Sequence, residues 1–391
     1  MKLLYACADR ADDPLLWSGF VSNCRQALLD IGVELVVFDQ IPFECPLSVR
    51  LLHQLHKRLG RKVHMVQLEP GVLRRAAARI ATRFAQGDCD AVFSPGAGVP
   101  VYAYLPASIP VVSYLDATKR TWIANYFGLE TLCTRSLRHV DEVDRVSLRN
   151  NALTIFSSDW AQAEAMRDYN VAADRTAVVP IGANLVAAPS HEEVEHWINA
   201  RGRDALRLLF LGKEWPRKGG PDALALVRAL RARGISATLD VVGCEPELDA
   251  PDRSFARVHG FIDHSTAAGR EKFHALLRET HLLLFLSHAE AYGIALCEAA
   301  AFGVPAFANR VGGIPTIVQP GINGWLNDLP FSADAAADKL AAVWRAPDEY
   351  RRVALAARGD FEARLNWGAA GRSLRALVEH VLERRAVKTS P

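Results

Sequence analysis

The sequence predicts an α/β protein with two doubly wound parallel sheets. Short apolar runs alternate with longer segments of helical periodicity along most of the 391 residues, and this is the pattern of βα units. The alternation stops at 182–203, where Pro189 and the acidic run HEEVEH occur, and it starts again at Leu206. At about 100–200 residues per domain, the length accommodates two such sheets.

In the first half, each expected strand is a short apolar run bounded by polar residues or glycine. Helical patterns lie between these runs, for example at 21–31 and 73–84, and Gly32 follows the first of them as a C-terminal stop. The expected strands are 2–8, 34–38, 91–94, 111–114, 154–157 and 176–180.

The second half repeats the pattern, and we expect a short helix in the connection at 182–203. The expected strands are 206–211, 238–242, 281–287, 305–308 and 324–326. The expected helices are 221–233, 271–278, 294–302 and 335–344. Because ligands of open α/β sheets bind at the carboxyl ends of the strands, we expect both sets of strand ends to face a cleft.

Composition excludes several classes of protein. Lys and Arg total 46 and Asp and Glu total 44, a net charge of +2, so nothing favours a nucleic-acid partner. No run of 18 apolar residues occurs, so no transmembrane helix is expected. The first apolar run ends before Asp9 and is too short for the apolar region of a signal peptide. Seven dispersed cysteines without a CxxC pair favour reduced thiols. We therefore expect a cytoplasmic protein.

The most informative segment begins at His281, where an expected strand leads through a loop into a helix. Glu290 lies on the loop, and Glu298 lies about one turn inside the helix. The free N–H groups at Gly293, Ile294 and Ala295 lie between them, at a helix N-terminus that favours anions. Two carboxylates beside such a terminus suit a ligand with hydroxyls and a phosphate. Alone, two glutamates are more often solvated surface residues.

A second polar loop follows the strand at 206–211. Gly212 opens this loop, and Lys213 and Lys218 flank Pro216 before a helix begins. Two cations at the carboxyl end of a strand suit a diphosphate. Two lysines in a loop are otherwise more often solvated.

The segment EAYGIALCE, with the following AFGVPAFANRVGGIPTIV, resembles the E-x7-E motif of the retaining GT-B glycosyltransferases of family 4. The resemblance implies a GT-B fold of two Rossmann-like domains around a cleft. It implies that Glu290 contacts the hydroxyls of the donor sugar and Glu298 those of the ribose. The amides at 293–295 would serve the sugar and the diphosphate. Tyr292 stands where this family usually has Phe.

The segment GKEWPRKGG is similar to the G-R-x4-K-G pattern of the same family. The resemblance implies that Lys213 and Lys218 neutralise the departing diphosphate in place of a metal ion, so no metal is expected. Lys213 stands where Arg is usual and lacks the guanidinium fork, and Arg217 is a candidate substitute. The histidines of HEEVEH are five residues apart rather than the four of a zinc motif.

Further matches involve other strand ends. Ser18 and Gly19 resemble the family's glycine loop, and Gly243, Gly260 and Phe261 resemble residues that flank the nucleobase. Asp116 follows an expected strand that resembles the acceptor-side strand, although Leu115 replaces the usual His. From sequence alone, Asp116 is equally well explained as the N-cap of the next helix.

The resemblance also implies a domain organisation. Residues 1–184 would form the acceptor-side domain and 185–365 the nucleotide-sugar domain, with a helix at about 366–391 crossing back to the first. The implied reaction transfers a sugar from a nucleotide-sugar donor, a UDP- or GDP-sugar, to an acceptor hydroxyl with retention. The acceptor would be a glycan or a lipid-linked molecule, in polysaccharide, lipopolysaccharide or glycolipid biosynthesis, and no cofactor is expected. Phosphorylase or UDP-sugar epimerase chemistry and a non-catalytic nucleotide-sugar binder stay open as alternatives.

One charge cluster remains outside this scheme. From Arg50 to Arg83 there are nine Lys or Arg and a single acid, Glu69. Arg75, Arg79 and Arg83 recur every four residues on an expected amphipathic helix. The pattern is typical of a solvated helix face. The alternative is peripheral contact of the 50–83 region with anionic lipid at the inner face of the cell membrane.

Overall fold

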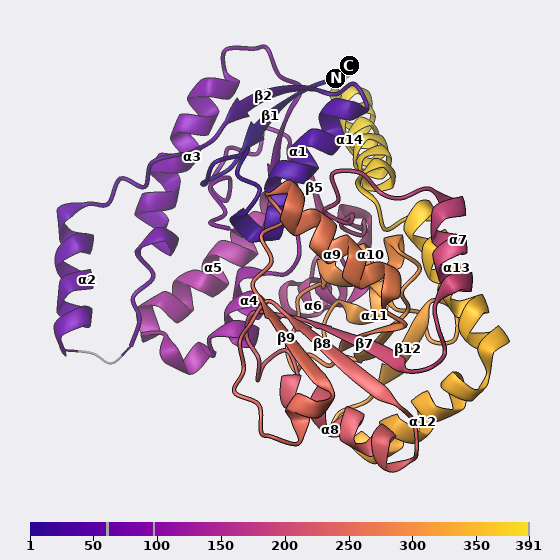
Figure 1. Cartoon of the computed structure of the whole chain (residues 1–391). Helices are drawn as coiled ribbons and strands as arrows, with labels where there is room; N and C mark the ends of the chain where they lie inside the picture. Colours follow the sequence, from indigo (N-terminus) through magenta and orange to yellow (C-terminus); the bar gives the residue numbers. More distant parts are fainter. Residues whose placement is uncertain (60–61, 97, 390–391) are drawn as a thin grey trace. The chain divides into compact units, whose positions relative to one another are not determined.

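The computed structural model describes residues 1–59, 62–96 and 98–389. Contacts between residues divide the chain into two compact units. The N-terminal unit comprises Met1–Asn184 together with Trp367–Pro391, and the C-terminal unit comprises Leu185–Asn366. Both ends of the chain thus belong to the N-terminal unit, and Figure 1 shows the marks for the two termini side by side.

The N-terminal unit is built on a six-stranded sheet in which every neighbouring pair is parallel. The strand order is β2-β1-β3-β4-β5-β6. Strands β3, β4 and β5 are buried along their whole length, as is typical of a sheet covered on both faces. The strands are β1 (Lys2–Ala6), β2 (Glu34–Phe38), β3 (Ala91–Pro95), β4 (Val111–Leu115), β5 (Leu153–Phe156) and β6 (Thr176–Val178).

The helices of this unit connect successive strands, and the last one joins them from the end of the chain. Helix α14 packs on α1 so closely that a Cβ on Gly371 would lie 2.9 Å from the Ala27 carbonyl oxygen. The helices are α1 (Phe20–Asp30), α2 (Leu47–Leu59), α3 (Pro70–Phe84), α4 (Lys119–Tyr126), α5 (Thr134–Asn150), α6 (Asp159–Tyr169) and α14 (Trp367–Thr389).

The C-terminal unit has a second parallel six-stranded sheet, of order β12-β11-β10-β7-β8-β9. Its strands are β7 (Leu206–Leu211), β8 (Ala237–Val242), β9 (Ala256–Gly260), β10 (Leu282–Phe285), β11 (Ala306–Asn309) and β12 (Gly324–Asn327). Its helices are α7 (His191–Ala200), α8 (Gly220–Ala232), α9 (Ala267–Glu279), α10 (Ile294–Ala301), α11 (Ile314–Ile317), α12 (Ala333–Arg345) and α13 (Pro347–Ala363).

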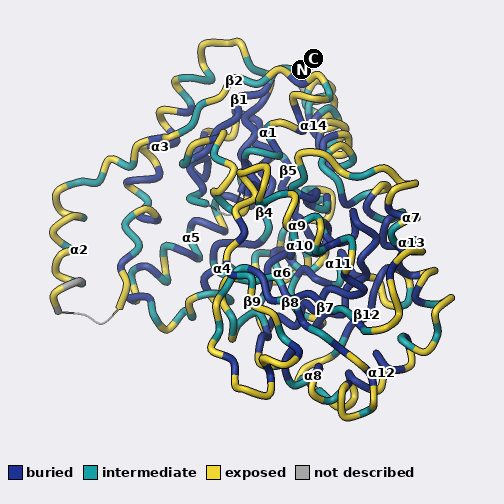
Figure 2. The backbone as a smooth tube through the Cα atoms, in the orientation of Figure 1, coloured by how far each residue is buried: buried dark blue, intermediate teal, exposed yellow. Residues whose placement is uncertain are grey.

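The expected doubly wound sheets are thus confirmed, with strand ends displaced by a few residues. Every expected strand occurs, and so does the short helix in the connection, which is α7. Periodicity did not predict β9, because this strand lies at the edge of the sheet and its middle residues are exposed. Only the family resemblance placed a strand end at Gly260. Figure 2 shows the central strands of each unit as buried and the helix surfaces as exposed.

Within the part of the chain that the structure describes, no helix combines the length and apolarity needed to cross a membrane. All seven cysteines belong to that part, and all are free thiols.

Candidate active site

The C-terminal sheet changes direction between β7 and β10. From β7 the chain proceeds outward through β8 to β9, whereas β10 lies on the other side of β7 and leads to β11 and β12. The loops after β7 and β10 therefore leave neighbouring strands at the point where ligands of open α/β sheets bind. These two loops carry Lys213, Lys218 and Glu290.

The structure joins the two loops through an ion pair between Lys218 and Glu290. The Lys218 ammonium donates a hydrogen bond to Glu290 Oε2. Both side chains are largely buried, and Ser287 Oγ lies 3.4 Å from the same oxygen. Lys218 Nζ also lies 4.8 Å from the centroid of the Phe285 ring. Sequence reasoning selected both residues but did not predict that they touch.

Gly219 explains how the loops come so close. This residue has φ +77°, and a Cβ on it would lie 2.0 Å from the backbone oxygen of Leu286. Only glycine fits here, because a side chain would need both a left-handed backbone and the space of that carbonyl. The start of α8 therefore packs directly against the end of β10, which places Lys218 beside Glu290.

The other predicted donor-side residues follow the neighbouring strand ends. The N–H of Gly212 donates to the Val242 carbonyl at 3.0 Å, and the N–H of Gly243 donates to the Gly260 carbonyl at 2.9 Å. The exposed Lys213 places its Nζ 5.4 Å from the centroid of the Phe261 ring. These residues thus lie along the side of the sheet where the carboxyl ends of β7, β8 and β9 lie.

Phe261 stands out because it is 61% exposed. A large apolar side chain is more commonly buried, and this one lies at the carboxyl end of edge strand β9 with a cation over its face. An aromatic face available to solvent at this edge can stack on a flat ring.

Helix α10 begins where the sequence placed a helix N-terminus. Gly293 is its N-cap, with φ +108° and no side-chain cap. Ile294 and Ala295 follow in the first turn, so their amides lie at the positive end of the helix. Both residues are half-buried. Glu298 lies on the second turn, and it is also half-buried.

Arg217, the candidate substitute for the missing arginine, forms hydrogen bonds within the protein. Its guanidinium hydrogen-bonds both oxygens of Glu214 at 2.9 Å and the Ala289 carbonyl at 2.8 Å. The hydrogen bond from Arg217 lowers the pKa of Glu214. The fork of Arg217 thus braces the loop after β7 against the loop after β10.

In the N-terminal unit, the predicted glycine loop has an unusual backbone. Trp17, Ser18 and Gly19 are all left-handed, with φ values of 51°, 53° and 78°. The side chain of Asn184 donates to the Ser18 carbonyl oxygen and accepts from Trp367 Nε1 at 2.8 Å. Asn184 therefore fixes this loop, a role that no local sequence signal revealed.

Asp116 follows β4 and is half-buried. The N-cap explanation for Asp116 is wrong, because Thr118 caps α4 through its hydroxyl, which accepts from the Thr121 N–H at 3.2 Å. Close by, burial lowers the pKa of Lys119 to about 8 and raises that of Asp144 to about 6. Sequence reasoning missed Lys119, since a lysine in the first turn of a helix is ordinarily solvated.

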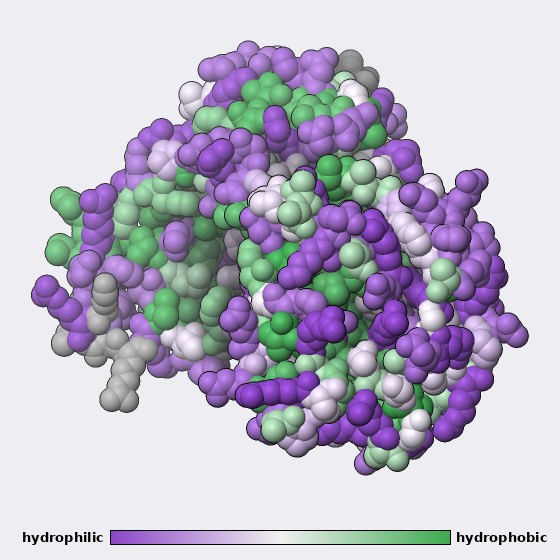
Figure 3. All heavy atoms as spheres, in the orientation of Figure 1, coloured by the Kyte–Doolittle hydropathy of each residue, from purple (hydrophilic) through white to green (hydrophobic). Residues whose placement is uncertain are grey.

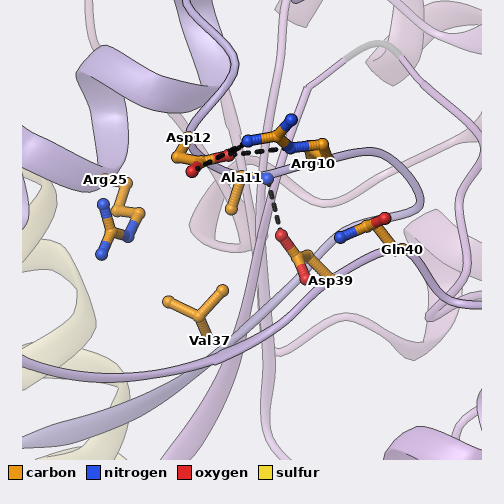
Figure 4. A pocket seen from close by; sticks show the side chains of 7 residues that line it. All are labelled: Arg10, Ala11, Asp12, Arg25, Val37, Asp39 and Gln40. Carbon is orange, nitrogen blue, oxygen red and sulfur yellow. Dashed lines mark hydrogen bonds and ion pairs between the residues drawn. The ribbon is translucent and has the colours of Figure 1, made fainter.

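A pocket of about 360 Å³ lies at the ends of β1 and β2 (Figure 4). Arg10 hydrogen-bonds Asp12 at 3.2 Å, and Asp39 accepts from the Ala11 N–H at 2.9 Å. Arg25 reaches toward the same space from α1. Two arginines and two aspartates give the lining no net charge, so the pocket has no preference for an anion.

No group of three or more His, Cys, Asp or Glu side chains could hold a metal ion in the described ranges 1–59, 62–96 and 98–389. In the HEEVEH run, His191 Nδ1 lies 3.1 Å from Glu362 Oε1, on α13.

The regularly spaced arginines of α3 have partners within the protein. Arg79 forms an ion pair with Glu44, and Arg83 forms one with Asp88 at 2.8 Å. Arg75 donates to the Glu44 carbonyl at 3.3 Å. Arg61, which was counted in the same basic cluster, lies outside the described residues.

Residues 191–360 match the family model described as "Glycosyl transferases group 1". This part of the chain belongs to that family. The match covers the two loops joined by Lys218 and Glu290, together with α10.

A curated protein similar to this chain is the D-inositol 3-phosphate glycosyltransferase of Frankia alni, which is 29% identical over 234 residues. The alignment covers 56% of each protein, so the chain spans about half the length of this relative.

Solved structures match nearly the whole chain. Sucrose-phosphate synthase from Thermosynechococcus elongatus has a TM-score of 0.66 at 18% identity and covers 98% of this chain and 100% of its own. Anabaena HepE in complex with UDP has a TM-score of 0.64 at 17% identity, with coverages of 97% and 100%. The chain therefore has the GT-B fold, as the sequence predicted.

Proposed function

We propose that this protein is a retaining glycosyltransferase that moves a sugar from a nucleotide-sugar donor to an acceptor hydroxyl. The observation that carries the proposal is the meeting of the β7 and β10 loops through Lys218 and Glu290, inside the segment that matches the family model. A nucleotide sugar needs cations for its diphosphate and acceptors for its hydroxyls, and this edge of the sheet offers both.

Lys213 and Lys218 would hold the diphosphate. Lys213 is exposed on its loop, while Lys218 is fixed by Glu290. The amides of Gly293, Ile294 and Ala295 at the start of α10 would add partial positive charge. We propose that these groups stabilise the departing diphosphate without a metal ion, and that no cofactor takes part.

Glu290 would accept hydrogen bonds from the donor sugar, and Glu298 would bind the ribose hydroxyls. Gly212, Gly243 and Gly260 at the strand ends would border the bound nucleotide, and the nucleobase would stack on the exposed Phe261. Structures of Anabaena HepE have been determined with UDP and with UDP-glucose. We therefore propose a uridine nucleotide as the first donor to test.

Ser18 and Gly19 of the N-terminal unit would approach the donor, and Asp116 would contact the acceptor or the donor sugar. Residues 1–184 with the C-terminal helix would thus serve the acceptor, and 185–366 the donor. In the reaction, the acceptor oxygen would attack the anomeric carbon on the face that the diphosphate leaves. The departing diphosphate would accept the acceptor's proton, so the protein acts by positioning and electrostatics.

A thermal-shift panel tests the donor site. UDP, GDP, ADP and CMP are added to the wild type and to Glu298→Ala, each with and without EDTA, with the exposed Glu192→Ala as control. A nucleotide at about 100 times its Kd stabilises a protein by about 2.7 kcal/mol. We expect one nucleoside diphosphate to raise the Tm of the wild type and the control irrespective of EDTA, with the shift lost in Glu298→Ala.

Other results would redirect the assignment. No shift with any nucleotide would refute the donor site, and a shift abolished by EDTA would refute metal independence. Nucleotide binding without transfer to any acceptor and without slow hydrolysis of UDP-glucose would favour a non-catalytic nucleotide-sugar binder.

We also propose that the 50–83 region contacts an anionic membrane, through α2 rather than through the paired arginines of α3. Leu47, Leu51 and Leu55 of α2 are 76%, 72% and 52% exposed at helical spacing, and Figure 3 shows apolar side chains at the surface in this region. Arg50 and Arg58 are exposed on the same helix, which has no acidic residue.

Sedimentation with vesicles tests this contact. We expect binding to phosphatidylglycerol vesicles that falls sharply in Leu51→Gln/Leu55→Gln and that is absent with phosphatidylcholine alone. Equal sedimentation of the variant and the wild type would refute the role of α2.

A further inference from the structure

Two tryptophans meet at the carboxyl ends of β1 and β4. Trp17 lies in the segment after β1, and Trp122 lies on α4, which follows β4. Their ring centroids are 5.6 Å apart and the rings are inclined by 64°. Each ring is half-buried, so part of it is open to solvent. Phe127, whose ring lies 5.0 Å from that of Trp122, is 57% exposed.

The position of Trp17 is maintained by its surroundings. A bulky residue rarely adopts a left-handed backbone, yet Trp17 has φ 51° and ψ 41°. Its indole Nε1 donates to Asp9 Oδ2 at 3.2 Å, and a Cβ on Gly98 would lie 3.5 Å from the same nitrogen. An unfavourable backbone that contacts hold in place is typical of functional sites.

Charged groups border the two rings. Lys119 is buried, and its Nζ lies 4.5 Å from the ring centroid of Trp122 and 5.8 Å from that of Trp17. Asp9 lies at the indole nitrogen of Trp17. Aromatic carbon and ionic groups thus lie side by side at the end of the sheet where ligands of this fold class bind.

This combination suits a sugar ring. One face of a pyranose presents C–H groups with slight positive charge, and the face of an aromatic ring is negative. The edge of the pyranose carries hydroxyls, which need hydrogen-bond partners such as a carboxylate. An anion would require an excess of positive charge, and a small open-chain polyol has no flat apolar face to cover an indole.

We propose that Trp17 and Trp122 form an aromatic platform that binds a pyranose ring of the acceptor, with Asp9 accepting hydrogen bonds from its hydroxyls. This inference rests on the proposed function and narrows the acceptor to a carbohydrate or a glycan-bearing molecule. The platform is distinct from the pocket beside Arg10 and Arg25, whose lining includes no aromatic residue.

Acceptor kinetics with the full chain test the platform. Transfer from UDP-glucose, or from the sugar nucleotide that the thermal-shift panel selects, is measured with methyl pyranosides, with glycerol and with L-malate. The variants are Trp17→Leu, Trp122→Leu and the conservative Trp17→Phe. Trp344→Leu is the matched control, because this half-buried tryptophan lies in the C-terminal unit beside His281, which precedes β10.

We expect a pyranoside to be an acceptor, and its KM to rise about tenfold in Trp17→Leu and Trp122→Leu. The KM for the pyranoside should rise by a larger factor than the Kd for the nucleotide, which the thermal shift reports. Trp17→Phe should recover part of the lost acceptor binding. Trp344→Leu should have the same KM as the wild type. Transfer to polyols or malate but to no pyranoside would overturn the platform, as would an unchanged KM.

A fluorescence titration separates failure of the platform from failure of the proposed function. Methyl pyranosides at millimolar concentration should change the tryptophan emission of the wild type and of Trp344→Leu, and this change should be lost in Trp17→Leu. The measurement needs no donor, so it decides on the platform even when nucleotides give no shift. No response of the wild type to any methyl pyranoside would overturn the proposal.

Discussion

The pair formed by Lys218 and Glu290 shows what a single contact does at the candidate donor site. It places a carboxylate and an ammonium within one hydrogen bond in a largely buried position. Removing one partner of such a pair leaves the other charge desolvated, which costs far more than the pair contributes. The stability of the two loops therefore depends on the presence of both charges.

We expect Lys218→Met to lower the free energy of unfolding by about 3 kcal/mol. The double variant Lys218→Met/Glu290→Gln should recover a large part of this loss, because no buried charge is then left without a partner. Urea unfolding of the two single variants, the double variant and the wild type gives the coupling energy. Additive effects of the two substitutions would contradict a direct interaction.

A second residue makes stability depend on pH. His281 is fully buried, its Nδ1 accepts the Arg207 N–H at 3.1 Å, and burial lowers its pKa to about 3. Below about pH 6.5 the unfolded chain binds a proton that the folded protein excludes. Stability contributed by neutral His281 is therefore complete above that pH and declines toward pH 3.

We expect this residue to remove about 1.4 kcal/mol of stability for each pH unit below 6.5. His281→Asn retains an acceptor but does not titrate, so its stability should fall less steeply with pH than that of the wild type. Unfolding midpoints from pH 7 to pH 4.5 check this difference. Parallel pH profiles for the two proteins would disprove the role of His281.

At the scale of elements, the two ends of α8 provide a comparison. Gly219 precedes this helix and Gly234 follows it, with nearly equal φ values of +77° and +78°. A Cβ on Gly219 would lie 2.0 Å from the Leu286 oxygen, whereas a Cβ on Gly234 would meet nothing within 4 Å. The packing of α8 on β10 thus distinguishes two glycines that have the same backbone conformation.

We expect Gly234→Ala to cost about 1 kcal/mol, the price of a left-handed alanine. Gly219→Ala should cost at least about 2 kcal/mol more, because the loop must move away from β10. It should also weaken nucleotide binding, since Lys218 is the next residue. Thermal unfolding and nucleotide-induced shifts of both variants test this, and equal losses of stability would contradict the close approach.

The elements also show how far sequence reasoning reaches. Periodicity located β7 and α10 because their apolar runs are long and have clear stops. It missed β9, whose pairing with β8 determines its structure more than its own side chains do. Sequence alone could select the residues of the site one by one, because they lie in the loops that follow the expected strands. It could not predict their contacts, because Lys218 meets Glu290 across 72 residues of chain.

At the scale of the whole molecule, one unit interrupts the other. The N-terminal unit is complete only when α14 is added from the end of the chain. Leu374 and Val378 of α14 are fully buried, and the Trp367 ring stacks on Phe20 with centroids 6.0 Å apart. Residues near the C-terminus thus stabilise a core that is otherwise formed by the first 184 residues.

We expect Leu374→Asp to unfold the N-terminal unit, because it places an unpaired carboxylate in this core. The adjacent Ser373 is exposed, so Ser373→Asp should behave like the wild type. Limited proteolysis identifies the unit affected, since the first variant should be cleaved within 1–184 while 185–366 stays resistant. Resistance of 1–184 in Leu374→Asp would contradict the dependence on α14.

The interrupted chain order also has a consequence for biosynthesis. The C-terminal unit is a continuous segment, and all of it leaves the ribosome before α14 does. The N-terminal unit is made first but must wait for about 200 further residues, which at about 5–20 residues per second takes roughly 10–40 s. During this interval the face of α1 that packs on α14 in the folded protein has no partner helix. The half that is synthesised first is therefore the half that finishes folding last.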